Sequence, residues 1–261
     1  MLSIAPKVIF EDEDLLVLDK PAGMIVNRAD TTKDLATVQD FVEKYLKIRI
    51  PKHEVRNKSE GSNDRNGFEF RDLNFEFTNR VGIVHRLDKE TSGILLVAKT
   101  LKAFINLQAQ FKERKVKKTY VALTHGKIEP AEGEINVPVG RLPWNRKRFG
   151  VIADGRESVT KYKTINNFQL TMNHELLTLV ELYPKTGRTH QIRIHLQYIH
   201  HPIFADSLYA GRKTGRQDRK LLPRIFLHAS KISFYCPKTN KLIFFESPLP
   251  RDLNNFLESL N

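Results

Sequence analysis

The sequence is poor in the residues that build covalent or metal-based frameworks. Its 261 residues contain a single cysteine, Cys236, which excludes an internal disulfide and a cysteine-based zinc cluster. No stretch approaches the roughly 18–20 consecutive apolar residues that a membrane-spanning helix needs. The first residues, 1–6, are weakly apolar and soon followed by acidic residues, unlike a targeting signal. We therefore expect a cytoplasmic protein without a membrane partner.

Acidic residues are also scarce relative to basic ones. The chain has 30 Asp and Glu against 43 Lys and Arg, which gives a formal net charge of +13. Such an excess attracts polyanions, and nucleic acid is the commonest polyanion inside cells. The alternative is a basic surface that only keeps the protein in solution. Charge alone therefore favours a nucleic-acid partner without establishing one.

Apolar periodicity predicts the secondary structure. Helical spacing predicts helices over 34–48, 101–112 and 189–198, with a final helix from Arg251. Apolar runs predict two strands within 7–20 and further strands over 93–99, 119–128, 158–168, 175–183, 225–234 and 242–246. Because strands often follow strands without an intervening helix, we predict an α+β fold with a mixed, largely antiparallel sheet flanked by helices and loops.

The segment 52–79 differs in composition from its surroundings. Its RNKSEGSNDRNG stretch is polar, rich in turn residues and without periodicity, which predicts a flexible surface insertion. The FEFRDLNFEF that follows alternates enough to predict a strand or a hairpin arm. We predict a single domain over 1–261 that carries this insertion at 52–79.

The segment VHRLDKETSGILL at 84–96 can present a reactive group. Its apolar strand, led by Gly93, would anchor a polar loop with Asp88 at the tip, and loops held by rigid strands often carry function. The alternative is that Asp88 only forms an Asx-turn with the backbone N–H groups that follow it.

The segment PKTGRTHQIRIHL at 184–196 places basic and imidazole side chains among apolar residues at helical spacing. It contains no carboxylate, its arginines would repel a cation, and His190 and His195 are not four residues apart, so we predict no metal site. Both histidines are expected to be structural. Arg188, in the turn before the helix, can reach a carboxylate or a phosphate.

Five blocks of the sequence resemble one known family. HRLDKETSG closely resembles H-R-L-D-x-x-T-S-G, the catalytic signature of the RluA-type pseudouridine synthase family. The other four blocks follow the order of that family and are LDKPAGM at 18–24, KKTYVAL at 117–123, TGRTHQIRIH at 186–195 and HPIFADSLYAG at 201–211. The resemblance implies a mixed-sheet catalytic domain with RNA across a basic cleft, and neither a metal nor an organic cofactor.

The resemblance also implies roles for four residues. Asp88 matches the nucleophile, and Arg188 matches the arginine that pairs with the catalytic carboxylate and favours its ionised form. Tyr120 matches the tyrosine that stacks under the target uracil, although a buried sheet residue is the alternative. Arg86 matches the residue that fills the gap left by the flipped base. Whether Asp88 attacks C1′ of the ribose or C6 of the ring is left open.

Basic residues that flank these blocks are the predicted RNA contacts, with solvated basic faces as the alternative. They lie in the signature and in the runs KERKVKK at 112–118 and GRKTGRQDRK at 211–220. The candidates are Arg86, His85, Lys115, Lys117, Lys118 and Arg212. We expect ribosomal or transfer RNA as the substrate and a monomer as the active form. Since the chain starts almost directly at the catalytic blocks, we expect no separate N-terminal RNA-binding domain.

Two other functions are alternatives. A catalytically inactive RNA-binding module on the same fold would not need Asp88, Tyr120 and Arg188 together. A hydrolase or kinase-like enzyme is suggested by His85, Arg86 and Asp88. A kinase, however, needs a glycine-rich phosphate loop and downstream metal-binding Asn and Asp residues, which the sequence lacks.

Overall fold

The computed structural model describes residues 5–28, 35–47, 65–170 and 174–260. The chain divides into two compact units, and each has its own secondary structure. Unit 1 comprises 1–89, 95–113 and 235–241, and unit 2 comprises 90–94, 114–234 and 242–261. Within the described ranges, no helix has the length and apolar character that crossing a membrane requires.

Unit 1 begins with the hairpin that the sequence predicts within 7–20. β1 (Lys7–Glu11) and β2 (Leu15–Lys20) pair antiparallel. The acidic turn between them is closed by Asp12, whose carboxylate accepts the backbone N–H groups of Asp14 and Leu15 at 2.8 and 2.7 Å. The strand order continues to β3 (Ser92–Ala98), which is buried throughout, as its apolar run predicts.

Two helices of unit 1 start at threonine caps. α1 (Val38–Tyr45) follows Thr37, whose hydroxyl accepts the N–H of Asp40, while the Asp40 carboxylate accepts the N–H of Thr37. α3 (Leu101–Lys112) follows Thr100, whose hydroxyl accepts the N–H of Ala103. These bonds, reciprocal at α1 and single at α3, satisfy backbone donors that a helix start leaves unpaired. The helix predicted over 101–112 is confirmed with its bounds. The helix predicted over 34–48 is confirmed over Val38–Tyr45, and residues 34 and 48 lie outside the described residues.

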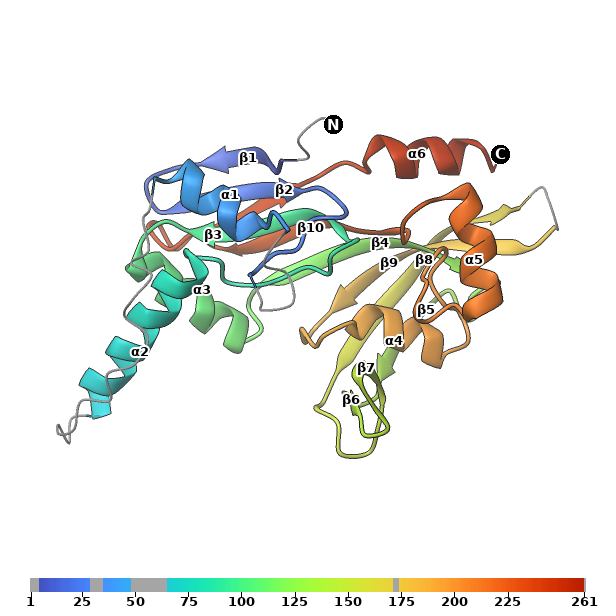
Figure 1. The fold of residues 1–261 in the computed structure, drawn as a ribbon, viewed down its shortest axis with the longest axis horizontal. Helices are drawn as coiled ribbons and strands as arrows, with labels where there is room; N and C mark the ends of the chain where they lie inside the picture. The colour runs from blue at the N-terminus through green and yellow to red at the C-terminus, as the bar shows by residue number, and fades with distance from the viewer. Residues whose placement is uncertain (1–4, 29–34, 48–64, 171–173, 261) are drawn as a thin grey trace. The chain divides into compact units, whose positions relative to one another are not determined.

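The helix α2 (Arg65–Arg80) corrects the strand predicted at FEFRDLNFEF. The same segment places Phe70, Leu73 and Phe77 at i, i+3 and i+7, which also fits one face of a helix. Phe77 packs edge-on against Phe104 of α3 with ring centroids 5.5 Å apart, so contact with another helix decides between the two patterns. Figure 1 shows the ribbons of α2 and α3 as neighbours. Residues 52–64 of the predicted insertion lie outside the described residues.

Unit 2 is built on a sheet whose strand order is β10-β4-β9-β8-β5, with antiparallel pairing throughout. β11 pairs with β10 off this path, and the start of β3 pairs with β10 in parallel. The predicted mixed, largely antiparallel sheet is therefore confirmed. The strands of this sheet are β4 (Lys117–His125), β5 (Glu132–Asn136), β8 (Val159–Gln169), β9 (Leu176–Pro184), β10 (Leu227–Tyr235) and β11 (Leu242–Glu246).

A separate two-stranded hairpin and three helices complete unit 2. β6 (Val139–Leu142) and β7 (Asn145–Val151) form the hairpin, which lies beside α4 (Gln191–Tyr198) (Figure 1). The other helices are α5 (Arg212–Leu221) and α6 (Arg251–Glu258). The sequence predicted α4 and α6, whereas it missed α5, β5 and the hairpin.

Candidate active-site elements

The Asp88 loop in unit 1 is held beside β3 by one backbone carbonyl and one imidazole side chain. The carbonyl of Gly82 accepts the N–H of Ala98 at 2.8 Å, and the imidazole Nε2 of His85 accepts the N–H of Leu96 at 3.0 Å. Val84 and Leu87 are buried, Asp88 is half-buried and Arg86 is exposed. The apolar residues therefore anchor the loop and leave its charged side chains at the surface. His85 is neutral in this geometry, and its predicted RNA contact stays a prediction.

A buried lysine ties a second block of the sequence to this loop. Lys20, at the end of β2, is fully buried, and its ammonium donates to the carbonyls of Pro21, Met24 and Lys89 at 2.8, 2.8 and 3.1 Å. The N–H of Gly23 donates to the same Lys89 carbonyl at 2.8 Å. The LDKPAGM turn thus fixes the residue directly after Asp88. The sequence analysis gave Lys20 no role, although a lysine that closes an apolar strand was a visible signal.

The second half of the signature, 90–93, is anchored within unit 2 by side chains. The Glu90 carboxylate accepts from the Arg219 guanidinium at 2.9 Å. Arg224 donates to the Ser92 hydroxyl at 3.1 Å, and Ser92 in turn bonds Nδ1 of His228 at 3.0 Å. His228 donates from Nε2 to the carbonyl of Ser247 at 2.9 Å, so its Nδ1 is the acceptor for Ser92. The serine of T-S-G therefore belongs to a buried relay of hydrogen bonds.

The glycine of T-S-G allows β3 and β10 to approach closely. Gly93 has φ +112°, and a Cβ there would lie 2.2 Å from the carbonyl oxygen of Ala229, its partner in the parallel pair. Any side chain would therefore be strained twice, by the backbone conformation and by the contact. This packing requirement explains why the signature ends in glycine.

Tyr120 lies in the central strand β4 of unit 2. Its backbone pairs with Leu182 of β9 and Ala229 of β10, and the residue is buried, with 9% of its surface exposed. A ring in this position is rigidly placed by two neighbouring strands. Its role under the target uracil stays a prediction.

The turn that carries Arg188 is fixed by one buried amide. The Gln191 side-chain oxygen accepts the Arg188 N–H at 3.0 Å and the Thr186 hydroxyl at 2.7 Å. Its amide nitrogen donates to the carbonyl of Val159 and the hydroxyl of Thr160 on β8, at 3.1 and 3.0 Å. Gln191 therefore holds the turn at 186–188 against the sheet, a positioning role that the sequence analysis did not assign.

The predicted basic contacts of unit 2 fall into two environments. Lys115, Lys117 and Arg212 are exposed, as phosphate contacts require. Lys118 is half-buried, and burial lowers the pKa of its ammonium to about 8. Its Nζ lies 3.8 Å from the place that a Cβ on Gly187 would occupy, so the structure brings Lys118 beside the Arg188 turn.

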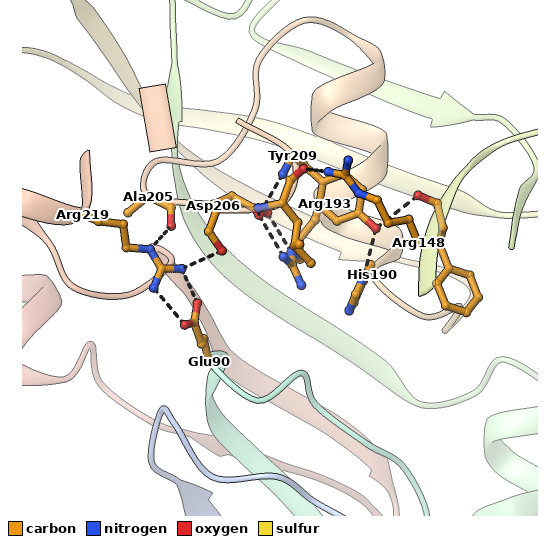
Figure 2. A network of polar contacts seen from close by, with 11 residues as sticks. Glu90, Arg148, His190, Arg193, Ala205, Asp206, Tyr209 and Arg219 are labelled. Atoms are coloured by element: carbon orange, nitrogen blue, oxygen red, sulfur yellow. Dashed lines mark hydrogen bonds and ion pairs between the residues drawn. The ribbon is translucent and has the colours of Figure 1, made fainter. Parts of the chain in front are cut away.

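A polar network in unit 2 connects the signature with the other blocks (Figure 2). Its centre is a buried ion pair in which Arg193 of α4 donates to both oxygens of Asp206, at 2.7 and 2.8 Å. Arg219 of α5 binds the carbonyl of Ala205 at 2.8 Å as well as Glu90. The segment after Asp88 is thus joined to the HPIFADSLYAG block through α5.

The other arm of the network reaches the β6–β7 hairpin. Tyr209 lies under the Arg193 guanidinium, 5.0 Å from the ring centroid, and its hydroxyl bonds Nδ1 of His190 at 2.9 Å. The same hydroxyl donates to the carbonyl of Phe149 in β7 at 3.2 Å. His190, directly before α4, therefore has an internal partner, as its predicted structural role requires.

Comparison with known proteins decides the family. The model of the RNA pseudouridylate synthase family matches residues 14–198. The chain belongs to this family. A ribosomal large subunit pseudouridine synthase D of Nitrosomonas europaea is 33% identical over 263 residues, which cover 99% of this chain and 66% of that protein. A protein of the same name from Pseudomonas aeruginosa is 34% identical over 254 residues, which cover 94% and 69%.

The chain therefore spans about two thirds of the length of these curated relatives. Among solved structures, Human RNA Pseudouridylate Synthase Domain Containing 1 has the same fold, with a TM-score of 0.69 and 23% identity over 97% of this chain and 88% of that chain. The RluA-type family and the α+β class that the sequence predicts are both confirmed.

The pKa values of two further histidines of this pseudouridylate synthase family member are shifted in opposite directions. His195 is fully buried, and burial lowers its pKa to about 4, so it is neutral and donates to the carbonyl of Val137. Burial would also lower the pKa of His125, but hydrogen bonds and charge from Asp218 and Glu175 outweigh it and raise that pKa. Among the described residues, no group of three or more His, Cys, Asp or Glu is arranged to hold a metal ion.

Proposed function

We propose that this member of the RNA pseudouridylate synthase family isomerises specific uridines in structured RNA. The observation that carries the proposal is the match to the family over 14–198, which includes the whole HRLDKETSG signature. Relatives named for the large ribosomal subunit favour ribosomal RNA as the substrate, with transfer RNA as the alternative. A cytoplasmic monomer without a cofactor is part of the same proposal.

Asp88 is the proposed nucleophile. Its carboxylate attacks C1′ of the ribose or C6 of the ring to form a covalent bond, and the N1–C1′ bond breaks. The turned base then forms a C5–C1′ bond, and the bond to Asp88 breaks, which restores the carboxylate. The proton on C5 leaves to solvent and N1 takes up a proton, so the reaction is a balanced isomerisation. Arg188 favours the ionised carboxylate that this attack needs. The anchored backbone on both sides of Asp88 supports the proposal, because a positioned nucleophile avoids reorganisation at the moment of reaction.

Tyr120 and Arg86 are proposed to handle the flipped nucleotide. Extrusion of a stacked base costs a few kcal/mol, and contacts with the protein must compensate for that cost. Stacking on an aromatic ring contributes about 1–3 kcal/mol per base, which is the role we assign to Tyr120. The exposed side chain of Arg86 is the proposed replacement for the base within the RNA stack.

The remaining basic residues are proposed to bind the RNA backbone. Lys115, Lys117 and Arg212 carry positive charge near the family blocks, His85 is proposed as a neutral polar contact, and the chain as a whole has a net charge of +13. Log affinity should then fall linearly with log salt, with a slope of about −0.7 per phosphate contacted on a single strand. Such contacts position the RNA and do not select its sequence.

Pseudouridine mapping of total RNA, from cells with and without the gene, identifies the substrate. A uridine that is modified only when the gene is present supports the proposal. Purified protein should then release tritium from 5-tritiated uridine in that RNA, and Asp88→Asn should release none while it binds the RNA within a few-fold of wild type. Normal turnover by Asp88→Asn would refute the nucleophile. Wild-type protein that binds RNA but modifies no uridine would favour the inactive RNA-binding module.

A further inference from the structure

The basic residues at the start of β4 do not share one environment. Lys117 is exposed and donates to the carbonyl of Arg114 at 3.3 Å, whereas Lys118 is half-buried. Side chains alternate across a strand, so Lys118 projects to the same face of β4 as Tyr120, two residues further on. These two residues lie about 6–7 Å apart along the strand. Lys118 is therefore placed on the side of the sheet that carries the proposed platform for the target base.

The turn before α4 leaves open space beside the Lys118 ammonium. Gly187 is exposed and has no side chain, and the position of its missing Cβ is 3.8 Å from Nζ of Lys118. Within the part of the chain that the structure describes, this ammonium has no hydrogen bond and no ion pair. Burial of an unpaired cation is unfavourable, so the protein keeps a charge here that its own fold does not use.

The charges around this position are mostly positive. Arg188 follows Gly187 directly, and its Nε donates to the carbonyl of Glu157 at 3.3 Å. The Glu157 carboxylate is engaged by Arg114 at 3.2 Å. A cation with an open side, flanked by further cations, favours an anionic ligand, and lysine binds phosphate as a point charge.

We propose that Lys118 binds one backbone phosphate of the RNA in the space beside Gly187, next to the nucleotide whose base Tyr120 supports. This inference rests on the proposed function, and it separates Lys118, which binds one fixed phosphate, from the exposed lysines, whose backbone contacts are not assigned to a particular linkage. Lys118 then sets the register of the strand, because it fixes one phosphate relative to the target uridine.

The sharpest test combines a neutral linkage in the RNA with a variant of the protein. A series of short RNAs contains the mapped uridine, and each member carries one neutral methylphosphonate linkage beside a 2′-deoxynucleotide. The control for each member has the same 2′-deoxynucleotide with a normal, charged phosphate. Wild type should lose about 5–10-fold in affinity at one linkage, a loss of roughly one charge-assisted hydrogen bond. Lys118→Ala should lose that sensitivity and bind every linkage alike.

The matched control is Lys117→Ala, one residue away on the opposite face of β4. It should weaken binding to all the RNAs equally and keep the sensitive linkage. The same linkage profile for wild type and Lys118→Ala would overturn the proposal. A Lys118→Ala variant with normal affinity and slow turnover would overturn it as well, because that result indicates a chemical role.

A second pair of variants fills the space from the protein side. Gly187 has an ordinary negative φ, so a side chain is tolerated there. Gly187→Asp places a carboxylate beside the Lys118 ammonium and should weaken RNA binding as much as Lys118→Ala does. Gly187→Ala should stay within about twofold of wild type, since 3.8 Å is an ordinary contact distance. Equal losses in both Gly187 variants would show a steric effect and count against the phosphate.

The pH dependence of RNA affinity tests the proposal without a measurement of enzyme turnover. The free ammonium has a pKa of about 8, and a bound phosphate favours its charged form. The affinity of wild type for ribosomal RNA fragments should therefore fall as pH rises from 7 to 9, by at most tenfold per unit, and Lys118→Arg should flatten this dependence. The other charged groups described around Lys118 are Arg114, Arg188 and Glu157, and they are the same in wild type and in Lys118→Arg. An unchanged slope in Lys118→Arg would contradict the proposal.

Stability separates a binding role from a structural one. Lys118→Met removes a desolvated charge and should raise Tm by about 2–4 °C while it weakens RNA binding, a trade-off expected at binding sites. A lower Tm in Lys118→Met would show that the lysine supports the fold instead. The proposed function fails separately, if wild type converts no uridine to pseudouridine in any RNA.

Discussion

The two halves of the HRLDKETSG signature are held in different ways. In 85–89, Arg86 is exposed and Asp88 is half-buried. The loop is held by the His85 imidazole, which accepts the Leu96 N–H, and by the Lys20 ammonium, which donates to the Lys89 carbonyl. In 90–93, the side chains themselves are the anchors, since Glu90 and Ser92 bind arginines and Gly93 accommodates β10. The nine residues of the signature thus divide into 85–89, which carry the proposed functional side chains, and 90–93, whose side chains anchor the segment to unit 2.

This division explains why both halves of the motif are specific in sequence. A reactive carboxylate needs a fixed backbone, and part of that support comes from another residue, here Lys20, whose ammonium donates to the Lys89 carbonyl. The second half uses its own polar groups. Substitutions in the first half should therefore change activity more than stability, and those in the second half should do the reverse. Four variants test this, in order of expected effect on unfolding free energy.

Gly93→Ala should have the largest effect on stability. The new Cβ meets the Ala229 carbonyl at 2.2 Å in a backbone conformation with φ +112°, so about 3–5 kcal/mol of destabilisation is expected from strain and overpacking together. Urea denaturation measures the loss. Gly211→Ala is the matched control, because Gly211 has φ +87° but open space around its Cβ position, and about 1–2 kcal/mol is expected there.

Lys20→Met should separate activity from stability. The carbonyls of Pro21, Met24 and Lys89 lose a donor, while a buried charge is also removed, so a net loss of about 1–3 kcal/mol is expected. Turnover should fall roughly 100-fold, because the residue after Asp88 is no longer fixed and small displacements of a nucleophile are costly. Tritium release and thermal denaturation on one preparation give both numbers. Lys99→Met, which breaks the surface pair with Glu11, should leave turnover unchanged.

Glu90→Gln should cost about 0.5–1 kcal/mol, since its ion pair with Arg219 is partly exposed. Part of this difference should disappear at high salt, because salt screens exposed charges. Turnover should fall less than in Lys20→Met. The proposed division between the two halves would be wrong if Glu90→Gln lost as much turnover as Lys20→Met while both variants lost the same unfolding free energy. Thermal denaturation at 0.1 and 1 M salt makes the measurement.

Arg86→Ala should leave stability within about 0.5 kcal/mol of wild type, as expected for an exposed side chain. Turnover should drop more than RNA affinity, because the residue acts when the base leaves the stack. The salt dependence of binding, measured by titration with labelled RNA, should be nearly unchanged. A variant that only binds less tightly, with a flatter salt slope, would place Arg86 on the phosphate backbone.

Apolar periodicity predicted much of the fold, because it depends only on residues that are close in the sequence. α3 was predicted with its bounds since Phe104 and Leu107 repeat on one face, and β3 since its apolar run is unbroken. FEFRDLNFEF was assigned to the wrong class because its phenylalanines fit both periods, and only Phe104 of another helix decides between them. β5 and the β6–β7 hairpin were missed since they are short and carry few apolar residues.

The supporting residues of the site could not be predicted for a different reason. Lys20 reaches Lys89 across 69 positions, and Arg219 reaches Glu90 across 129. Such contacts depend on how distant segments meet, and no local period encodes that meeting. The resemblance to a family supplied roles for Asp88 and Tyr120. It did not indicate that Lys20 binds Lys89 or that Arg219 binds Glu90.

The contacts of His125 make the placement of α5 depend on hydrogen-ion concentration. His125 bonds Glu175 through Nδ1 at 2.7 Å and Asp218 of α5 through Nε2 at 3.0 Å, and it donates to both only when doubly protonated. Its pKa is raised in the folded state, so this stabilisation is fully present below about pH 6.5 and is lost as pH rises through the raised value. One proton thus acts as a ligand between strand and helix, and the helix that carries Arg212 loses one of its contacts when the pH rises above that raised pKa.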